Sequence, residues 1–314
     1  MNLESMKIGV VGCGAVGSFY GLMLKQAGED VHFHLRGNYE DVKKHGFSLI
    51  QQSTGGEIKK IKNASIYRNT NEIGVCDWVI IAIKATANSD IPGLIAPMVG
   101  EKTSFLTLQN GMGNVENLAE AFGKDRLIVG GLCFTCINRI NSTTIKSLLA
   151  GYVQFGEIGS NLSPKANRIV DCFENAGLKV RRADSLDDAL WRKLCWNVPF
   201  NGLCIVGGGI TTDLVLSNLE LRERAENLMR EIQSAAQESG VIIEDTFLEK
   251  QFSLTEPMGP YKPSSLIDFL AGKPIEIQAI WGEPLRRGQE KGVLLPELEK
   301  LYLELKHIAV KSKE

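Results

Sequence analysis

Short apolar runs separated by helical segments fill the first half of the chain. The clearest of these runs span residues 7–11, 77–83, 103–108 and 127–136. Continuous apolar runs of this length are typical of strands that are buried on both faces of a sheet, and helices between them favour parallel pairing. We therefore predict a parallel, doubly wound sheet. Its second strand is expected at residues 30–35, after a helix at residues 18–26 that Gly28 ends.

Three further segments extend the predicted sheet. Residues 47–66 have Gly55 and Gly56 in their middle, which predicts an inserted, hairpin-rich piece. Residues 152–158 and 178–181 are short enough to be strands, and we expect them to complete the sheet at its edge.

The pattern changes near Ala183, because from Ser185 onward the apolar residues recur at helical spacing. The clearest examples are residues 190–206, 220–240 and 295–310. We therefore expect an α/β dinucleotide-binding domain of residues 1–184 and an all-helical domain of residues 185–314. The second domain is expected to bind substrate and is able to supply the face of a homodimer.

Composition narrows the class of protein. The chain has 314 residues, 44% of them hydrophobic, and a net charge of −2, so two domains with sizeable cores are feasible. The sequence contains no basic run that predicts nucleic-acid binding and no apolar run of about 18 residues that predicts a membrane span. Residues 1–5 are too short and too polar for a signal peptide, and we expect a ragged extension there.

The seven cysteines lie in apolar segments and are odd in number. This pattern favours reduced, buried thiols and a cytoplasmic location over a disulfide framework. Cys133 and Cys136 form a C-x-x-C pair, but a structural zinc site needs two more ligands at similar spacing. We expect both thiols to lie on a strand, and we expect no metal.

Residues 7–17, Lys-Ile-Gly-Val-Val-Gly-Cys-Gly-Ala-Val-Gly, carry a G-x-G-x-x-G motif between a strand and a helix. Gly12 permits a tight turn, Gly14 lets the backbone approach a pyrophosphate, and Gly17 lets the helix pack on the strand. The free N–H groups at the start of the helix then face the phosphates. A purely structural glycine turn is the alternative. The expected cofactor contacts are Gly12, Cys13, Gly14, Ala15, Val16 and Gly17.

The residue after the second predicted strand indicates which dinucleotide binds. A site for NAD(H) places a carboxylate there to accept hydrogen bonds from the ribose 2′-hydroxyl, whereas this chain has Arg36. An arginine suits a 2′-phosphate, so we predict NADP(H). The alternative is that Arg36 is a solvated cation and that Glu40 or Asp41 bends back to the ribose.

Lys193, Asn197 and Asn201 lie four residues apart, so they form one stripe of the helix predicted at residues 190–206. Most residues around the two asparagines are hydrophobic, and a buried amide without partners costs about 1–3 kcal/mol per unmet group. The stripe therefore predicts a polar cleft that holds a polar ligand. An internal amide network between helices, with an exposed lysine, is the alternative.

Two other candidate positions follow predicted strands. The sequence Asn110-Gly111-Met112-Gly113 comes just after residues 103–108, and Lys84 just after residues 77–83. Open α/β sheets bind ligands at the carboxyl ends of their strands. A plain turn and a solvated lysine are the alternatives.

The helical half adds Glu276, Ser264 and Ser265. Glu276 follows Pro274, so we expect it in the first turn of a helix, where a carboxylate also complements the helix dipole. Ser264 and Ser265 follow a proline-rich loop and are expected to cap the helix that contains Asp268.

Taken together, these residues resemble the ketopantoate reductases (2-dehydropantoate 2-reductases), dehydrogenases of the 6-phosphogluconate-dehydrogenase-like type. The resemblance covers nearly the whole chain. Its specific part is the Lys-x3-Asn-x3-Asn helix together with Asn-Gly-Met-Gly, since the glycine motif is shared widely. It rests on Gly12, Gly14, Gly17, Arg36, Lys84, Asn110 to Gly113, Lys193, Asn197, Asn201, Pro263, Ser264, Asp268 and Glu276.

The resemblance implies a role for each matching residue. Lys193 is the general acid that protonates the ketone oxygen, and Glu276 supports the substrate and that lysine. Asn110 binds near the nicotinamide and the substrate. The remaining roles are substrate binding by Asn197, Asn201 and Ser264, and NADP binding by Arg36 and Lys84.

The implied activity is NADPH-dependent reduction of ketopantoate to pantoate, a step towards coenzyme A. Two residues depart from the family pattern: Ser265 stands where methionine is common, and Gly202 where proline is frequent. Both are expected to reshape the substrate end of the pocket. A reductase of another 2-oxo acid and a non-catalytic NADP(H)-binding sensor remain alternatives.

Overall fold

A computed structural model of the chain describes residues 5–159 and 161–311, so residues 1–4 of the expected N-terminal extension lie outside the described part. The contacts divide the chain into two compact units. One unit runs to Gln109 and again from Asn114 to Leu186. The other takes Asp187 onward and also the loop Asn110–Gly113. This loop therefore packs with the second unit, although it follows a strand of the first.

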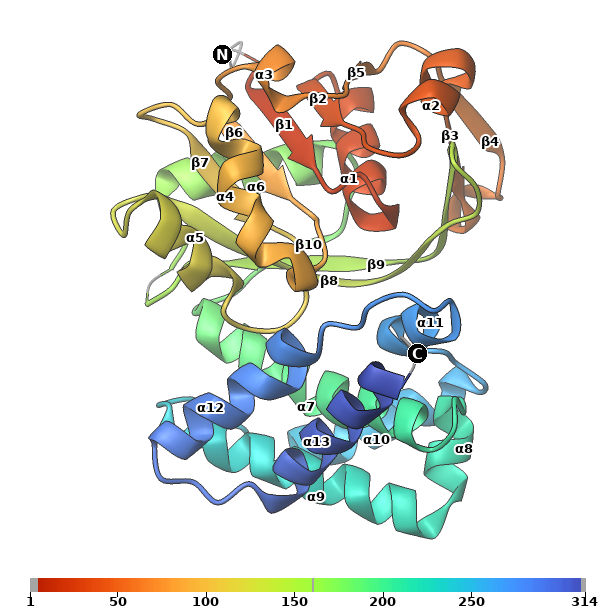
Figure 1. Ribbon diagram of the computed structural model, residues 1–314, viewed down its shortest axis with the longest axis vertical. Coiled ribbons are helices and arrows are strands. Elements are labelled where there is room, and N and C mark those ends of the chain that lie inside the picture. The colour runs from red at the N-terminus through yellow and green to blue at the C-terminus, as the bar shows by residue number, and fades with distance from the viewer. Residues whose placement is uncertain (1–4, 160, 312–314) are drawn as a thin grey trace. The chain divides into compact units, whose positions relative to one another are not determined.

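The first unit is built on one mixed sheet (Figure 1). In the described residues, the strands follow the order β4-β3-β9-β8-β7-β6-β1-β2-β5, with β10 paired to β9. Their bounds are β1 Lys7–Val11, β2 Asp30–His34, β3 Phe47–Gln51, β4 Ile58–Ile61, β5 Ser65–Tyr67, β6 Trp78–Ile81, β7 Ser104–Thr107, β8 Ile128–Arg139, β9 Thr144–Gly156 and β10 Val180–Arg182.

The centre of the sheet confirms the predicted parallel arrangement. β1 pairs in parallel with β2 and β6, β6 with β7, and β7 with β8. Every residue of β6 and β7 is buried, as expected for strands covered on both faces. The glycine-rich turn thus follows a strand with a parallel neighbour on each side.

The prediction that residues 152–158 complete the sheet at its edge is wrong. β9 begins at Thr144, pairs antiparallel with β8, and lies between β8 and β3 inside the sheet. The connection of residues 140–143 is too short for a parallel crossover, which needs a dozen or more residues. The start of β9 also lacks a continuous apolar run, because Ile145 and Ser147 are buried whereas Leu148 and Leu149 are exposed.

The segment of residues 47–66 contains the predicted hairpin, since β3 and β4 pair antiparallel. Two features go beyond that prediction. β3 joins the sheet through a parallel pairing with β9, and β5 pairs in parallel with β2. The residues that follow β2 and β5 therefore lie at one edge of the sheet, side by side.

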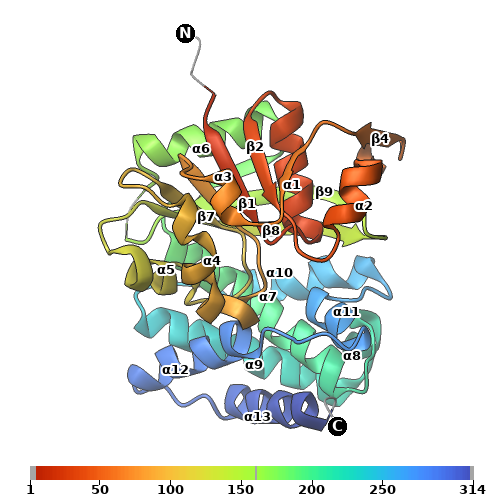
Figure 2. The same ribbon diagram turned by 45° about the horizontal axis from the view of Figure 1, so that its top comes forward.

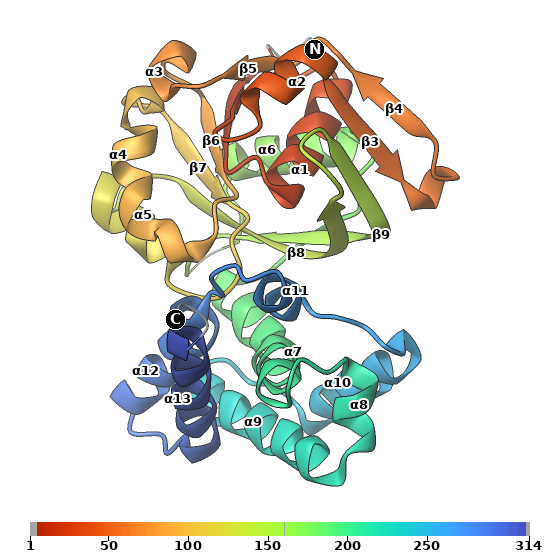
Figure 3. The same ribbon diagram turned by 45° about the vertical axis from the view of Figure 1, so that its right-hand side comes forward.

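Helix α1 starts at Ala15, three residues before the predicted start, directly after the glycine turn. It contacts β1 and β2 and also β8 and β9, so the sheet curls around it (Figure 3). Phe19, Tyr20 and Phe155 are among the buried residues of this core. The other α-helices of the unit are α2 Tyr39–His45, α3 Thr70–Ile73, α4 Ile91–Ile95, α5 Asn114–Phe122 and α6 Pro164–Asn175.

Helices are the only regular elements of the second unit in its described residues, which confirms the predicted helical character of the C-terminal part. Helix α7 lies among the other helices (Figure 2) and buries Trp191, Leu194 and Phe200. A helix that is apolar on most sides is expected at such a central place. The bounds are α7 Leu186–Val206, α8 Thr212–Ser217, α9 Leu219–Glu238, α10 Asp245–Thr255, α11 Ser264–Leu270, a π-helix Gln278–Gly282, α12 Glu283–Glu290 and α13 Pro296–Lys311.

Candidate active site

The three glycines of the turn between β1 and α1 have three different surroundings. Gly12 has φ +84°, and a Cβ atom there would lie 2.2 Å from the backbone nitrogen of Ile83. A Cβ atom on Gly17 would lie 2.5 Å from the carbonyl oxygen of Gly12, whereas one on Gly14 would meet nothing closer than 3.9 Å. A dinucleotide site needs a tight turn at Gly12, an open backbone at Gly14 and close packing at Gly17. The surroundings of the three glycines therefore fit a bound pyrophosphate.

Arg139, at the end of β8, braces this turn. Its Nη2 donates to the carbonyl oxygen of Cys13 and, over 3.2 Å, to Oγ of Ser18. Ser18 Oγ donates to the same Cys13 oxygen over 3.0 Å. Burial lowers the pKa of the Arg139 guanidinium, but an arginine stays charged. The sequence offers no signal for this contact, because 126 residues separate Arg139 from Cys13.

The tip of β2 carries Arg36, which is exposed. Glu40, the carboxylate that could instead reach a ribose, forms an ion pair with Arg68 at 2.5 Å. Arg68 comes directly after β5, the parallel neighbour of β2. Arg36, the cation predicted from the sequence, thus has a second arginine, Arg68, at the end of the adjacent strand.

Lys84 is exposed and precedes the 3-10 helix Ala85–Asp90, past the carboxyl end of β6. A network of amides follows it. Asn88 Oδ1 accepts from Gln109 Nε2 over 2.7 Å, and Asn88 Nδ2 donates to Asn114 Oδ1 over 2.9 Å. Thr107 Oγ1 donates to Gln109 Oε1 over 2.9 Å. The network holds both ends of the loop Asn110–Gly113, and sequence reasoning missed it.

The loop Asn110–Gly113 places the side chain of Asn110 against Lys193. Lys193 Nζ, on α7, donates to Asn110 Oδ1 over 3.1 Å. The loop is held on the π-helix, where Met112 N donates to the carbonyl oxygen of Ala279 over 2.8 Å. Gly111 has φ +81°, and a Cβ atom on it would lie 2.3 Å from that oxygen. Glycine at position 111 is therefore required by close packing as well as by the turn.

Asn197 and Asn201 lie on α7, with 9% and 1% of their surfaces exposed. Asn201 Oδ1 accepts from the backbone N–H of Ser265 over 3.0 Å, and its Nδ2 donates to the carbonyl oxygen of Asn197 over 3.1 Å. The predicted serine caps are wrong: Ser264 is already the first residue of α11, and neither serine side chain caps the helix. Asn201 satisfies the N–H of Ser265 from α7 instead.

Glu276 is 4% exposed. It lies just before the helix that begins at Ile277, so the prediction of a first-turn position is wrong by one residue. A π-helix follows, a form that is frequent at functional sites. Trp281 of the π-helix donates through Nε1 to the carbonyl oxygen of Val198 over 2.9 Å. Hydrogen bonds thus join the π-helix both to α7 and to the loop that carries Asn110.

This arrangement places the Lys193 ammonium against the amide of Asn110, and a buried carboxylate, Glu276, lies on a segment that is hydrogen-bonded to the same helix. Such a set can donate a proton and orient a polar ligand. Cys133 and Cys136 lie on β8, which confirms their predicted strand position, and neither is in a disulfide. Among the described residues, no group of three or more His, Cys, Asp or Glu is placed to hold a metal ion.

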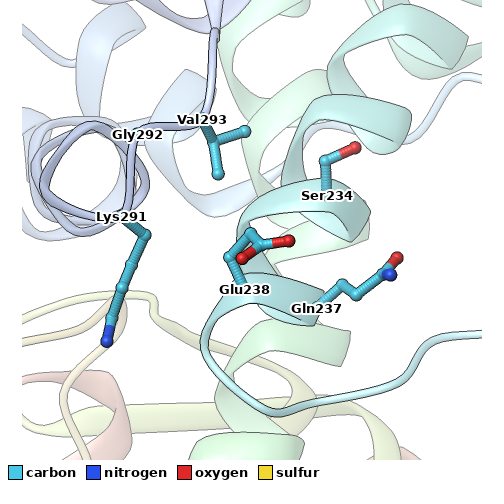
Figure 4. A pocket seen from close by; sticks show the side chains of 6 residues that line it. All are labelled: Ser234, Gln237, Glu238, Lys291, Gly292 and Val293. Carbon is cyan, nitrogen blue, oxygen red and sulfur yellow. The ribbon is translucent and has the colours of Figure 1, made fainter.

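One surface pocket of about 300 Å³ lies beside the end of α9 (Figure 4). Its lining residues are Ser234, Gln237, Glu238, Lys291, Gly292 and Val293. None of the candidate site residues lines it, so it plays no part in the chemistry considered above. In the part of the chain that the structure describes, no helix is long and apolar enough to span a bilayer.

Comparison with known proteins covers both units. Residues 8–160 match the family model "Ketopantoate reductase PanE/ApbA", and residues 185–309 match its C-terminal model. A 2-dehydropantoate 2-reductase of Nostoc sp. is 35% identical over 311 residues, which are 98% of this chain and 96% of that protein.

Solved structures give the same result. The 2-dehydropantoate 2-reductase of Geobacter metallireducens has a TM-score of 0.91 and 37% identity, with 96% of this chain and 99% of that chain covered. A D-mandelate dehydrogenase with NADH and anilino(oxo)acetate has a TM-score of 0.86 and 21% identity, with 98% and 99% covered. At that identity the second likeness concerns the fold alone. The family models, the Nostoc relative and the Geobacter structure together establish that this chain belongs to the ketopantoate reductase family, whose fold joins a Rossmann-type unit to a helical one.

Proposed function

We propose that this protein reduces ketopantoate (2-dehydropantoate) to pantoate with NADPH. The observation that carries the proposal is the contact between Lys193 Nζ and Asn110 Oδ1 at 3.1 Å. In this contact the Asn110 amide oxygen accepts a hydrogen bond from the Lys193 ammonium and thereby fixes its orientation. Family membership favours a reductase, and the ammonium fits the charge that develops on a reduced ketone.

Lys193 acts as the general acid. Reduction of a 2-oxo acid places negative charge on the carbonyl oxygen, and the Nζ ammonium stabilises this charge and then gives the oxygen its proton. Bound NADPH supplies the hydride that the carbonyl carbon receives. Asn110 orients the ammonium by accepting one of its N–H groups. Glu276, buried on the segment that leads into the π-helix, supports the substrate and the lysine.

The substrate is held by amide and hydroxyl groups of the helical unit. Asn197 offers a buried carboxamide, and Ser264 an exposed hydroxyl at the start of α11. Asn201 already uses both ends of its amide within the unit, so its contribution is to fix the start of α11 and with it Ser264. A homodimer formed through this unit stays a prediction.

The cofactor is held by the turn of residues 12–17, whose glycine surroundings fit a pyrophosphate. Arg36 and Lys84, both exposed past the carboxyl ends of β2 and β6, contribute positive charge. The 2′-phosphate of NADPH suits Arg36, because a carboxylate there would repel it.

The deciding experiment measures turnover with ketopantoate, using NADPH and NADH separately. We expect higher kcat/KM with NADPH. A panel of other 2-oxo acids, compared by kcat/KM, tests the substrate, since Ser265 and Gly202 depart from the family pattern. A preference for another 2-oxo acid would refute ketopantoate as substrate, and tight NADP(H) binding without turnover of any ketone would favour the sensor.

Replacing Arg139 by glutamine should weaken NADPH and NADH binding by a similar factor, about tenfold, as expected when a charge-assisted brace is lost. The glycine turn serves the pyrophosphate that both nucleotides share. Arg126→Gln is the matched control, because Arg126 Nη1 braces another loop by donating to the carbonyl oxygens of Gly100 and Glu101. Titration of nucleotide fluorescence checks both variants. A loss confined to NADPH would contradict the expected role.

Replacing Asn201 by alanine should raise KM for the 2-oxo acid and lower stability by about 1–3 kcal/mol, since the N–H of Ser265 loses its partner. Asn218→Ala is the matched control. The side chain of Asn218 accepts from the N–H of Leu221 over 3.0 Å at the start of α9. Thermal unfolding and steady-state kinetics should show a stability loss in both variants, with a raised KM in Asn201→Ala alone. Equal KM values would remove Asn201 from the substrate side.

A further inference from the structure

We propose that Arg68, together with Glu40, is a second determinant of selectivity for NADPH. This inference rests on the proposed use of NADPH and adds a residue to it. Arg68 presents a guanidinium beside Arg36, and it holds the Glu40 carboxylate away from the site of the 2′-phosphate.

Strand pairing places Arg68 next to the tip of β2. β5 runs parallel to β2 with His34 opposite Tyr67, and the N–H of Leu35 donates to the carbonyl oxygen of Tyr67 over 2.9 Å. Arg68 and Arg36 thus follow the carboxyl ends of two adjacent strands. This is the edge at which a parallel sheet binds its ligands.

His34 connects the two arginines. Its Nε2 forms a hydrogen bond of 3.1 Å with the carbonyl oxygen of Arg68. Burial lowers the pKa of His34, and the charge of Arg36 lowers it further, against the opposing effect of that hydrogen bond. Arg36 is therefore close enough to act on a ring that is bonded to the backbone of Arg68.

The Arg68 side chain is oriented by two contacts. Nη2 pairs with Oε1 of Glu40 at 2.5 Å, and Cζ lies 4.7 Å from the centre of the Tyr39 ring. The Glu40 contact engages one terminal nitrogen of a group that has five N–H donors. A guanidinium held in this way can contact a carboxylate and a phosphate together.

Charge explains the selectivity. Arg36, Arg68 and Glu40 sum to one positive charge at this edge, which favours a phosphate. Without Arg68 the sum is zero, and the Glu40 carboxylate loses its ion-pair partner. A carboxylate near the ribose repels a 2′-phosphate and can accept hydrogen bonds from a 2′-hydroxyl. Loss of Arg68 should therefore weaken NADPH binding and spare or strengthen NADH binding.

The test measures dissociation constants of NADPH and NADH for the full chain and for four variants: Arg68→Ala, Arg68→Ala with Glu40→Gln, Arg36→Ala and Arg182→Ala. Arg182 is the matched control, since it is a partly exposed arginine on β10 that pairs with Glu174 at 2.6 Å and Asp171 at 2.7 Å. Binding of 2′,5′-ADP and 5′-AMP, by competition, isolates the phosphate without any turnover.

We expect Arg68→Ala to raise the Kd of NADPH and of 2′,5′-ADP about tenfold or more, with the Kd of NADH and 5′-AMP unchanged or lower. Adding Glu40→Gln should recover part of the NADPH loss, and Arg182→Ala should change neither nucleotide. Equal effects of Arg68→Ala on NADPH and NADH, or no effect, would overturn this inference. If Arg36→Ala still weakens NADPH selectively in that case, the proposed cofactor stands. Equal binding of both nucleotides to the unaltered chain would instead refute both.

Discussion

Replacing Lys193 by alanine should lower kcat for NADPH-dependent ketopantoate reduction at least about a hundredfold, as expected for loss of a general acid. The carbonyl oxygen then develops its charge without the Nζ ammonium that stabilises and protonates it in the unaltered enzyme. Stopped-flow or steady-state measurement of NADPH absorbance checks this. Because the variant keeps the glycine turn intact, its Kd for NADPH should change little.

Two further variants distinguish loss of the general acid from the mere loss of a positive charge. Lys300→Ala removes an exposed lysine from α13 and should leave kcat unchanged. Asn110→Ala keeps the Lys193 ammonium but removes the oxygen that orients it, so its kcat should lie between those of the unaltered chain and Lys193→Ala. A Lys193→Ala enzyme that turns over at the original rate would remove this lysine from the mechanism.

Local sequence patterns predicted the central sheet well, because their physical cause is itself local. A strand buried on both faces favours apolar residues. β6 is apolar throughout, and β7 has Phe105 and Leu106 between buried Ser104 and Thr107. The glycine spacing likewise reports a turn formed within a few residues. Its three positions have the distinct surroundings that their expected roles require, as the contacts of Gly12, Gly14 and Gly17 show.

Local patterns failed where a strand is covered on only part of its surface. The start of β9 has no continuous apolar run, because Lys146 and Ser147 separate buried Ile145 from exposed Leu148 and Leu149. Its pairing with β8 is set by the short connection of residues 140–143, which the apolar pattern does not reveal. Of the two antiparallel pairs among the described strands, the glycines at residues 55 and 56 predicted the β3–β4 hairpin, whereas the apolar runs did not predict β8–β9.

In the candidate site, too, local features could be predicted from the sequence and long-range contacts could not. The stripe of Lys193, Asn197 and Asn201 follows from helical spacing, and both asparagines are buried. The polar, ligand-binding cleft that the stripe predicts stays a prediction. The contacts of these residues are long-range: Lys193 meets Asn110 across 83 positions of the chain and Asn201 meets Ser265 across 64. Nothing in the spacing shows that Asn201 satisfies another helix, and that alternative use is visible only in three dimensions.

Replacing Gly14 by alanine should raise the Kd of NADPH and of NADH about tenfold to a hundredfold, while destabilising the nucleotide-free protein less than Gly12→Ala does. Gly14 has a negative φ of −73°, but its ψ of −149° lies outside the usual extended range of residues with a Cβ atom, so some backbone adjustment is expected. The added Cβ atom itself would meet no heavy atom closer than the Gly12 carbonyl oxygen at 3.9 Å. The added methyl group would instead occupy the approach needed by the pyrophosphate, and overpacking of this kind costs about 1–3 kcal/mol. Nucleotide titration and thermal unfolding without nucleotide measure the two effects.

Gly12→Ala is the contrasting variant, and its main effect should be a lower stability of the nucleotide-free protein. At φ +84° an alanine is strained, and its Cβ atom would lie 2.2 Å from the backbone nitrogen of Ile83, so the loop after β6 must move. Destabilisation of several kcal/mol, seen as a lower Tm without nucleotide, is expected. If Gly14→Ala lowered the Tm as much as Gly12→Ala, folding alone would explain the glycine at position 14. That glycine would then no longer support a pyrophosphate site at the turn. Unchanged Kd values in a stable Gly14→Ala protein would place the pyrophosphate elsewhere.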